Sequence, residues 1–175
     1  LGFERFIESL KILSEKEGIP PFQGIILGSA QGRNVYKKQL ISLVEMHRLS
    51  KFVKFIDHCE EMRVAYRASN LVCSCSIEPE AFGRVSVEAQ SMQLPIVASD
   101  IGGSTETIIK EKTGFLFENK NPNSLADFIS IVMQKEYNSI KSMGVEGRKN
   151  VLKKFDVDKM CQTTFTEYKK LIELS

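Results

Sequence analysis

The chain has 175 residues, of which 42% are hydrophobic and 26% are charged, and its net charge is +2. This length suits one domain with a full core, and the balanced charge gives no electrostatic argument for binding nucleic acid. No apolar run reaches the roughly 20 residues that cross a bilayer, and the start, LGFERFIESL, does not have the pattern of a signal peptide. The sequence therefore predicts a cytoplasmic protein and leaves open a peripheral place at the inner face of a membrane.

Four cysteines occur, Cys59, Cys73, Cys75 and Cys161. They form no C-x-x-C pair, and the histidines do not have the spacing of zinc ligands, so we expect no metal site. Small apolar side chains in a reducing compartment are the simpler interpretation of these cysteines.

The first part of the chain alternates between helical and strand patterns. Apolar residues at helical spacing predict an opening helix, which Gly18 and the pair Pro20-Pro21 bring to an end. Short apolar runs predict the strands. The expected elements are a helix at 3–16, a strand at 23–28, a helix at 34–47, a strand at 52–56, a helix at 60–69 and a strand at 70–75.

The rest of the chain continues this alternation. Asp156 is a plausible helix cap inside the helical stretch at 137–173. The other expected elements are a helix from about 83 to 92, a strand at 95–99, a short helix after the loop at 102–106, a strand at 115–117 and a helix at 124–135, opened by Pro122 and Asn123.

Strict alternation of strands and helices, with continuous apolar runs in the central strands, predicts the α/β class. The expected fold is a Rossmann-like, doubly wound parallel sheet with helices on both faces and strands buried on both faces. Sheets of this kind bind ligands at the carboxyl ends of their strands.

Three loops would meet at that rim. They are the turn from Gly28 to Gly32, the segment EPEAFGRVSVE at 78–88, and the loop at Gly102 and Gly103. Glycine lets a ligand approach the backbone closely, and helix starts offer unpaired N–H groups that suit phosphate. Glycine turns are also common in any such sheet, so the loops alone leave ligand binding open.

The segment at 78–88 places a carboxylate on each side of a predicted helix start. In one interpretation Glu80 holds a sugar hydroxyl, the helix amides hold a phosphate, and Glu88 holds the hydroxyls of a ribose. In the other, Glu80 is a capping carboxylate and Glu88 a solvated helix acid. The spacing alone does not decide between them. The amides that would lie beside Glu80 are those of Phe82, Gly83, Arg84 and Val85.

The longer stretch EPEAFGRVSVEAQSMQLPIVASDIGGSTETI resembles the signature of family 4 retaining glycosyltransferases of the GT-B type. That signature is an acid, seven residues, a second acid, then E-A-x-x-x-G-x-P-V-I-A and a G-G-x-x-E loop. The likeness continues into Thr113-Gly114 and Leu125-Ala126 and covers nearly the whole chain. The matching residues are Glu80, Phe82, Gly83, Glu88, Ala89, Pro95, Ala98, Gly102, Gly103 and Glu106.

The resemblance implies a role for each matched residue. Glu80 would bind the donor sugar as the catalytic residue, and Glu88 would hold the ribose. The base would lie near His58 and Met62, although a loop histidine without function remains the alternative for His58. The implied donor-binding residues are Gly28, His58, Met62, Phe82, Gly83, Arg84, Val85, Glu88, Gly102 and Gly103, with no metal ligand.

The chain departs from the family pattern in three places. The family commonly has a Lys directly before the glycine that aligns with Gly2, where this chain has Leu1, and a phosphate-binding Arg further upstream. Gln93 replaces a glycine at a helix end, where a left-handed residue costs about 1 kcal/mol. Cys75 stands where proline is usual, which is expected to affect packing only.

We expect residues 1–175 to be a C-terminal nucleotide-sugar-binding domain without its amino-terminal acceptor domain, inactive by itself.

The implied reaction is retaining transfer of a hexose from a nucleotide diphosphate sugar to an acceptor hydroxyl, in bacterial surface glycan or lipopolysaccharide synthesis. No cofactor is expected, because the nucleotide sugar is a substrate. The alternatives are a nucleotide-sugar epimerase of the same architecture and a non-catalytic nucleotide-binding module. A nucleotide-dependent oxidoreductase is disfavoured, because no G-x-G-x-x-G follows the first strand.

Overall fold

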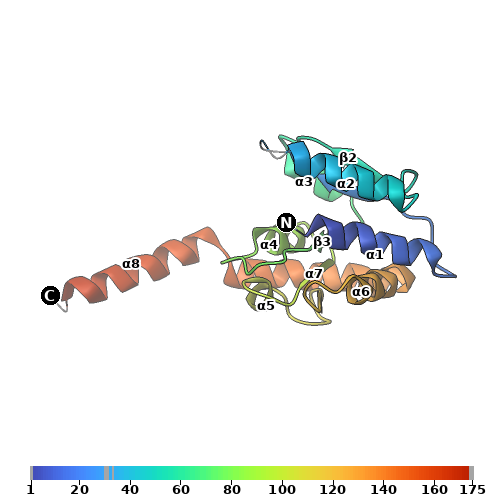
Figure 1. Ribbon diagram of the computed structural model, residues 1–175. Coiled ribbons are helices and arrows are strands. Elements are labelled where there is room, and N and C mark those ends of the chain that lie inside the picture. The colour runs from blue at the N-terminus through green and yellow to red at the C-terminus, as the bar shows by residue number, and fades with distance from the viewer. Residues whose placement is uncertain (1, 30–31, 33, 174–175) are drawn as a thin grey trace.

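The computed structural model describes residues 2–29, 32 and 34–173 of the chain (Figure 1). The predicted elements are present, with bounds within a few residues of those expected. The strands are β1 (Gly24–Leu27), β2 (Val53–Ile56), β3 (Val72–Ser74), β4 (Ile96–Ser99) and β5 (Phe115–Phe117). The helices are α1 (Phe3–Glu15), α2 (Asn34–Met46), α3 (Met62–Arg67), α4 (Arg84–Ser91), α5 (Ser104–Thr107), α6 (Pro122–Gln134), α7 (Tyr137–Lys154) and α8 (Val157–Glu173).

Side-chain caps set two helix boundaries. The Asn121 side-chain oxygen accepts from the amides of Asn123 and Ser124 at 3.0 and 3.2 Å, so α6 begins two residues earlier than the sequence predicts. The Asp156 carboxylate accepts from the amide of Asp158 at 2.9 Å. This confirms the predicted cap and divides the last helical stretch into α7 and α8.

The strands β3, β4 and β5 form a parallel sheet in which β4 and β5 are buried on both faces, whereas in β3 only Ser74 is buried. Val97 packs into one core cluster, whereas its neighbours Ile96 and Ala98 pack into a second cluster on the opposite face. In β5, Phe115 and Phe117 likewise join the first cluster and Leu116 the second. The predicted two-sided burial is therefore confirmed for β4 and β5.

The strands β1 and β2 form a separate parallel pair, for which two-sided burial was the wrong expectation. Ile26 and Val53 are buried, but the neighbouring Ile25 is 46% exposed and Ile56 at the end of β2 is 44% exposed. The physical reason is that only one face of this pair packs against the core cluster. Apolar runs do not distinguish a strand buried on both faces from one that leaves part of its surface in water.

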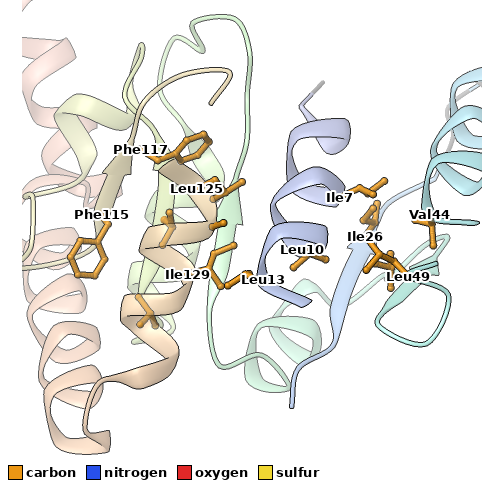
Figure 2. Close-up of a cluster of buried hydrophobic side chains, with 14 of the residues drawn as sticks. Ile7, Leu10, Leu13, Ile26, Val44, Leu49, Phe115, Phe117, Leu125 and Ile129 are labelled. Carbon is orange, nitrogen blue, oxygen red and sulfur yellow. The ribbon is translucent and has the colours of Figure 1, made fainter. Parts of the chain in front are cut away.

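The helix α1 connects the cores of the two sheets. Figure 2 shows Ile7 and Leu10 directed toward Ile26 of β1, while Leu13 lies beside Ile129 of α6. The three α1 residues are almost fully buried, and all five belong to one continuous core cluster. The two sheets therefore share a core although no strand pairing joins them within the described residues.

The last helix, α8, extends away from the rest of the chain (Figure 1) and has no buried residue. Six large apolar side chains along it are spaced so that, at about 3.6 residues per turn, they fall on one helix face. They are Val157, Met160, Phe165, Tyr168, Leu171 and Ile172, each more than half exposed. Within the described part of the chain, no helix is long and apolar enough to cross a membrane.

Candidate active site

Two loops at the carboxyl ends of β3 and β4 pack directly against each other. The amide of Gly103 donates to the carbonyl of Glu80 at 2.8 Å. A Cβ atom at Gly102 would lie 2.6 Å from that carbonyl oxygen, and one at Gly103 would lie 2.4 Å from the carbonyl carbon of Phe82. Because neither space admits a side chain, these glycines are required for the two loops to meet, which joins two of the three predicted loops in one place.

The Glu80 side chain is exposed at this junction and is held by one neighbour. The hydroxyl of Ser76, just beyond β3, donates to Glu80 Oε1. Glu80 does not cap α4, because the N-cap residue is Gly83 and no side chain accepts from the first amides of the helix. The capping interpretation of Glu80 is therefore wrong, and its carboxylate remains accessible to solvent.

The start of α4 presents unpaired backbone N–H groups. Gly83 is left-handed, with φ of 74° and ψ of 56°, and leads the chain into the helix. Among the described residues, the amides of Phe82, Gly83, Arg84 and Val85 have no hydrogen-bond acceptor. Free amides at a helix start, together with the helix dipole, favour an anion at this point.

Glu88, nearly two turns into α4, is held by two donors of different character. The Tyr66 hydroxyl of α3 donates to Glu88 Oε2 at 2.8 Å, and the Arg84 guanidinium donates to Glu88 Oε1 at 3.2 Å. Glu88 keeps 37% of its side chain exposed. Burial, followed by the hydrogen bond to Glu88, raises the pKa of Tyr66, so its hydroxyl stays protonated as a donor. A merely solvated helix acid is therefore the wrong description of Glu88.

The predicted base-side residues lie at the rim of the other strand pair. The amide of Gly28, after β1, donates to the carbonyl of Ile56, at the end of β2, at 2.9 Å. His58 is exposed in the loop that follows, and Met62, 40% exposed, begins α3. Among the described residues no hydrogen bond or ion pair joins Gly28 or His58 to the two glutamates of the α4 region. Ala30 and Gln31 of the first predicted loop, and Leu1, lie outside the described residues.

Comparison with known proteins decides the family. Residues 2–150 match the family described as glycosyl transferases group 1. The chain belongs to this family. The capsular polysaccharide biosynthesis glycosyltransferase CapM of Staphylococcus aureus is 26% identical over 155 residues, which cover 88% of this chain and 39% of CapM.

Solved structures agree with this family and with the predicted fold. A glycosyltransferase from Rickettsia africae ESF-5 superposes with a TM-score of 0.92 at 26% identity, over 99% of this chain and 45% of that one. Anabaena HepE in complex with UDP-glucose gives a TM-score of 0.84 at 26% identity, over 94% of this chain and 44% of HepE. The Rossmann-like GT-B fold is thereby confirmed, and the chain spans less than half the length of each of these proteins.

A buried polar network fixes three helices of the glycosyltransferase domain. The Gln90 amide of α4 donates to the carbonyl of Thr107, at the end of α5, at 3.0 Å. The Asn150 amide of α7 donates to that same carbonyl at 3.0 Å and to Gln90 Oε1 at 3.2 Å. Gln90 is fully buried and Asn150 nearly so. Sequence reasoning missed these residues, since an isolated Gln or Asn in a helix carries no local signal of burial.

Further neighbours of the site were also missed. Phe155, which follows α7, makes an edge-to-face contact with Phe82, with ring centroids 5.5 Å apart at 78°. Ser76 and Tyr66, which hold the two glutamates, were missed as well. Ser76 lies four residues before Glu80 in the same loop, and Tyr66 lies on α3, a different element from Glu88. Within the described part of the chain, no three His, Cys, Asp or Glu side chains form a group that could hold a metal ion.

The two departures that lie inside the described chain behave as expected. Gln93, directly after α4, has a left-handed φ of 61°. Cys75 packs, half-buried, against the core cluster, together with Cys73. Burial raises the pKa of the Cys73 thiol to about 12 and that of the Cys75 thiol well above its ordinary value.

Proposed function

We propose that this chain is the donor-binding part of a retaining glycosyltransferase that moves a hexose from a nucleotide diphosphate sugar to an acceptor hydroxyl. The observation that carries the proposal is the arrangement around α4, where unpaired amides at the helix start lie between the accessible carboxylate of Glu80 and the held carboxylate of Glu88. Diphosphate, sugar and ribose are three of the four parts of such a donor, the fourth being the base, and each of these three has a matching group here.

The proposed roles follow from the charge that each part carries. The leaving diphosphate gains negative charge as the bond to the sugar breaks, and fixed N–H dipoles aimed at it stabilise that charge. Glu80 accepts hydrogen bonds from sugar hydroxyls and orients the ring, and Glu88 does the same for the ribose. In this proposal the amides of α4, rather than a metal ion, meet the diphosphate. In this proposal Glu80 orients the sugar and is not assigned as a nucleophile.

A sugar donor and a surface-glycan product are supported by what related proteins are named for. HepE has been solved with UDP-glucose, and CapM is named for capsular polysaccharide biosynthesis. We propose a bacterial surface glycan or lipopolysaccharide as the destination of the sugar. The unpaired cysteines support a reducing, cytoplasmic location, where a lipid-linked acceptor would lie at the inner face of the membrane.

The acceptor site is proposed to lie in another domain of a longer protein. Support comes from α8, whose exposed apolar stripe calls for a partner surface. The Rickettsia structure matches 99% of this chain, yet more than half of that protein lies outside the match. A second domain that covers α8 and holds the acceptor accounts for both observations.

Calorimetric titration of the full-length protein with UDP, GDP, ADP and NAD tests the proposal. We expect one nucleoside diphosphate to bind and NAD not to bind, and the diphosphate that binds identifies the base. Assays with the corresponding nucleotide sugar then separate transfer to an acceptor from epimerisation of the sugar. NAD binding, or no diphosphate binding at all, would overturn the assignment.

A further inference from the structure

The two donors that hold Glu88 differ in how firmly the protein holds them. Tyr66 is 7% exposed and lies in the core cluster with Ala89 and Ile108, so its ring has little freedom. The Arg84 side chain is 84% exposed, and its bond to Glu88 is a surface pair four residues apart on one helix. Exposed pairs of this kind contribute little and exchange readily with water.

Arg84 also lies on the first turn of α4, beside the unpaired amides. A diphosphate bound there would compete with Glu88 for the Arg84 guanidinium, because phosphate is a strong bidentate partner for Arg. Tyr66 would keep its bond, since its hydroxyl stays protonated and its ring cannot move without disturbing the core. With nucleotide bound, Tyr66 is then the partner that fixes the plane of the Glu88 carboxylate.

A carboxylate must be fixed in orientation to accept from two neighbouring hydroxyls at once. Glu88 has room for this, since two ionised oxygens offer about four acceptor positions and the hydrogen bonds from Tyr66 and Arg84 use two of them. If Oε2 loses its donor, the carboxylate rotates among several orientations and pays an entropy cost each time it binds. The hydrogen bond from Tyr66 therefore selects one orientation before the nucleotide arrives.

We propose that Tyr66 is a positioning residue that orients Glu88 toward the ribose hydroxyls, and that it thereby sets the preference of this domain for ribonucleotides over 2′-deoxyribonucleotides. The inference rests on the proposed function, since it takes the ribose as the ligand of Glu88. It goes further, because it assigns the distinction between ribose and 2′-deoxyribose to Tyr66 of α3, which acts through Glu88 and does not itself touch the ligand.

The test compares ribonucleotide with 2′-deoxyribonucleotide binding in Tyr66→Phe and in the wild-type full-length protein. Calorimetric titration is done with UDP, GDP and ADP, and with the 2′-deoxy form of whichever binds. We expect the wild type to prefer the ribonucleotide by about tenfold or more, which is the size of a hydrogen bond to a charged group. In Tyr66→Phe that preference should fall by about fivefold, mostly through weaker ribonucleotide binding.

Controls make the result specific to Glu88. The hydroxyl of Tyr36 on α2 donates in the same way to Glu4 on α1, at 2.8 Å. Tyr36→Phe removes that hydroxyl away from Glu88 and should leave the preference for the ribonucleotide unchanged. In Glu88→Gln the preference should already be low, and adding Tyr66→Phe should lower it no further. Because both nucleotides are titrated into the same sample, an unfolded fraction lowers the stoichiometry and not the preference.

Two results would overturn the inference, and they are distinguishable. A wild type that prefers the ribonucleotide, with a Tyr66→Phe variant that prefers it equally, rejects the role of Tyr66 and leaves the proposed function standing. A wild type that binds no nucleoside diphosphate rejects the proposed function, and the role of Tyr66 with it.

Discussion

The sheet β3–β4–β5 and the strand pair β1–β2 have the same parallel geometry but different surroundings. The first is buried on both faces at β4 and β5, and its loops, together with α4, bring Glu80, Gly103 and Glu88 into contact with partners that fix them. The second leaves Ile25 and Ile56 partly in water, and its rim residue His58 is exposed. A rigid support therefore lies under the groups proposed to meet the sugar and the diphosphate, whereas the strand pair on the base side leaves more of its surface in water.

Substitutions at the two rims are expected to differ most in their effect on catalytic activity. In the full-length enzyme, Glu80→Ala should lower kcat about a hundredfold or more, because it removes an interaction with the reacting sugar. His58→Ala should change kcat/KM by about threefold or less, since an exposed side chain on the open rim has no fixed geometry to lose. Steady-state kinetics with the nucleotide sugar whose diphosphate binds in the calorimetric titration measures both.

A matched control lies two residues away from Glu80. Glu78 is exposed in the same loop, and Glu78→Ala should leave turnover near the wild-type value. Equal losses in Glu78→Ala and Glu80→Ala would point to loop damage, and unchanged turnover in Glu80→Ala would remove this residue from the site.

A second comparison concerns stability. Ile96→Ala in β4 removes a fully buried side chain and should lower the free energy of unfolding by about 3 kcal/mol. Ile25→Ala in β1 removes a side chain that is 46% exposed and should cost about 1 kcal/mol or less. Urea unfolding followed by circular dichroism gives both values. Similar losses at the two positions would show that something covers the outer face of β1 in solution.

The two regions are also expected to differ, by a smaller factor, in how fast their cysteine thiols react. The pKa of Cys73, raised to about 12 by burial in the β3 sheet, keeps the thiol protonated at pH 8, and the thiolate is the reactive form. Cys59, in the loop after β2, is partly exposed like Cys73, but unlike Cys73 it does not pack against the core cluster. In variants with a single cysteine, labelling at pH 8 should be at least about tenfold slower at Cys73 than at Cys59.

The raised pKa of Cys73 also makes the stability of the folded protein depend on pH. The folded pKa of Cys73 lies above the unfolded value of about 8.5, so its contribution is complete below that pH and is lost as pH rises toward 12. Labelling of Cys73 should accordingly accelerate with alkaline unfolding. Fast labelling of Cys73 at neutral pH would show that the β3 sheet opens more easily than its burial indicates.

Local patterns in the sequence were sufficient for the elements and for part of the site. Periodicity located the helices and strands, and the spacing from Glu80 to Glu88 placed both acids correctly around the start of α4. Gly102 and Gly103 were predicted to allow close approach of a ligand, whereas in the structure the backbone that approaches them is that of Glu80 and Phe82 in the neighbouring loop. Asp156 was predicted correctly from a local pattern, and the left-handed backbone of Gln93 from the resemblance to the family, in which a glycine is usual there.

What the sequence could not give depends on partners distant along the chain. Tyr66 and Glu88 are 22 residues apart, and Gln90 and Asn150 are 60 residues apart. In each pair, the sequence around one residue contains no indication of its partner. The exposure of β1 was missed for a related reason. An apolar run reports that a strand is hydrophobic, but the number of covered faces depends on which other elements pack on it.

The network of Gln90, Asn150 and Thr107 has a consequence for how the domain opens. Separating α7 from α4 would remove the donor from Gln90 Oε1 while that oxygen is still surrounded by protein, which costs more than losing a bond exposed to water. Partial opening is therefore unfavourable, and α4, α5 and α7 are expected to unfold as one cooperative unit. Amide protons in the three helices should then exchange with deuterium at a common rate, slower than those of the projecting α8.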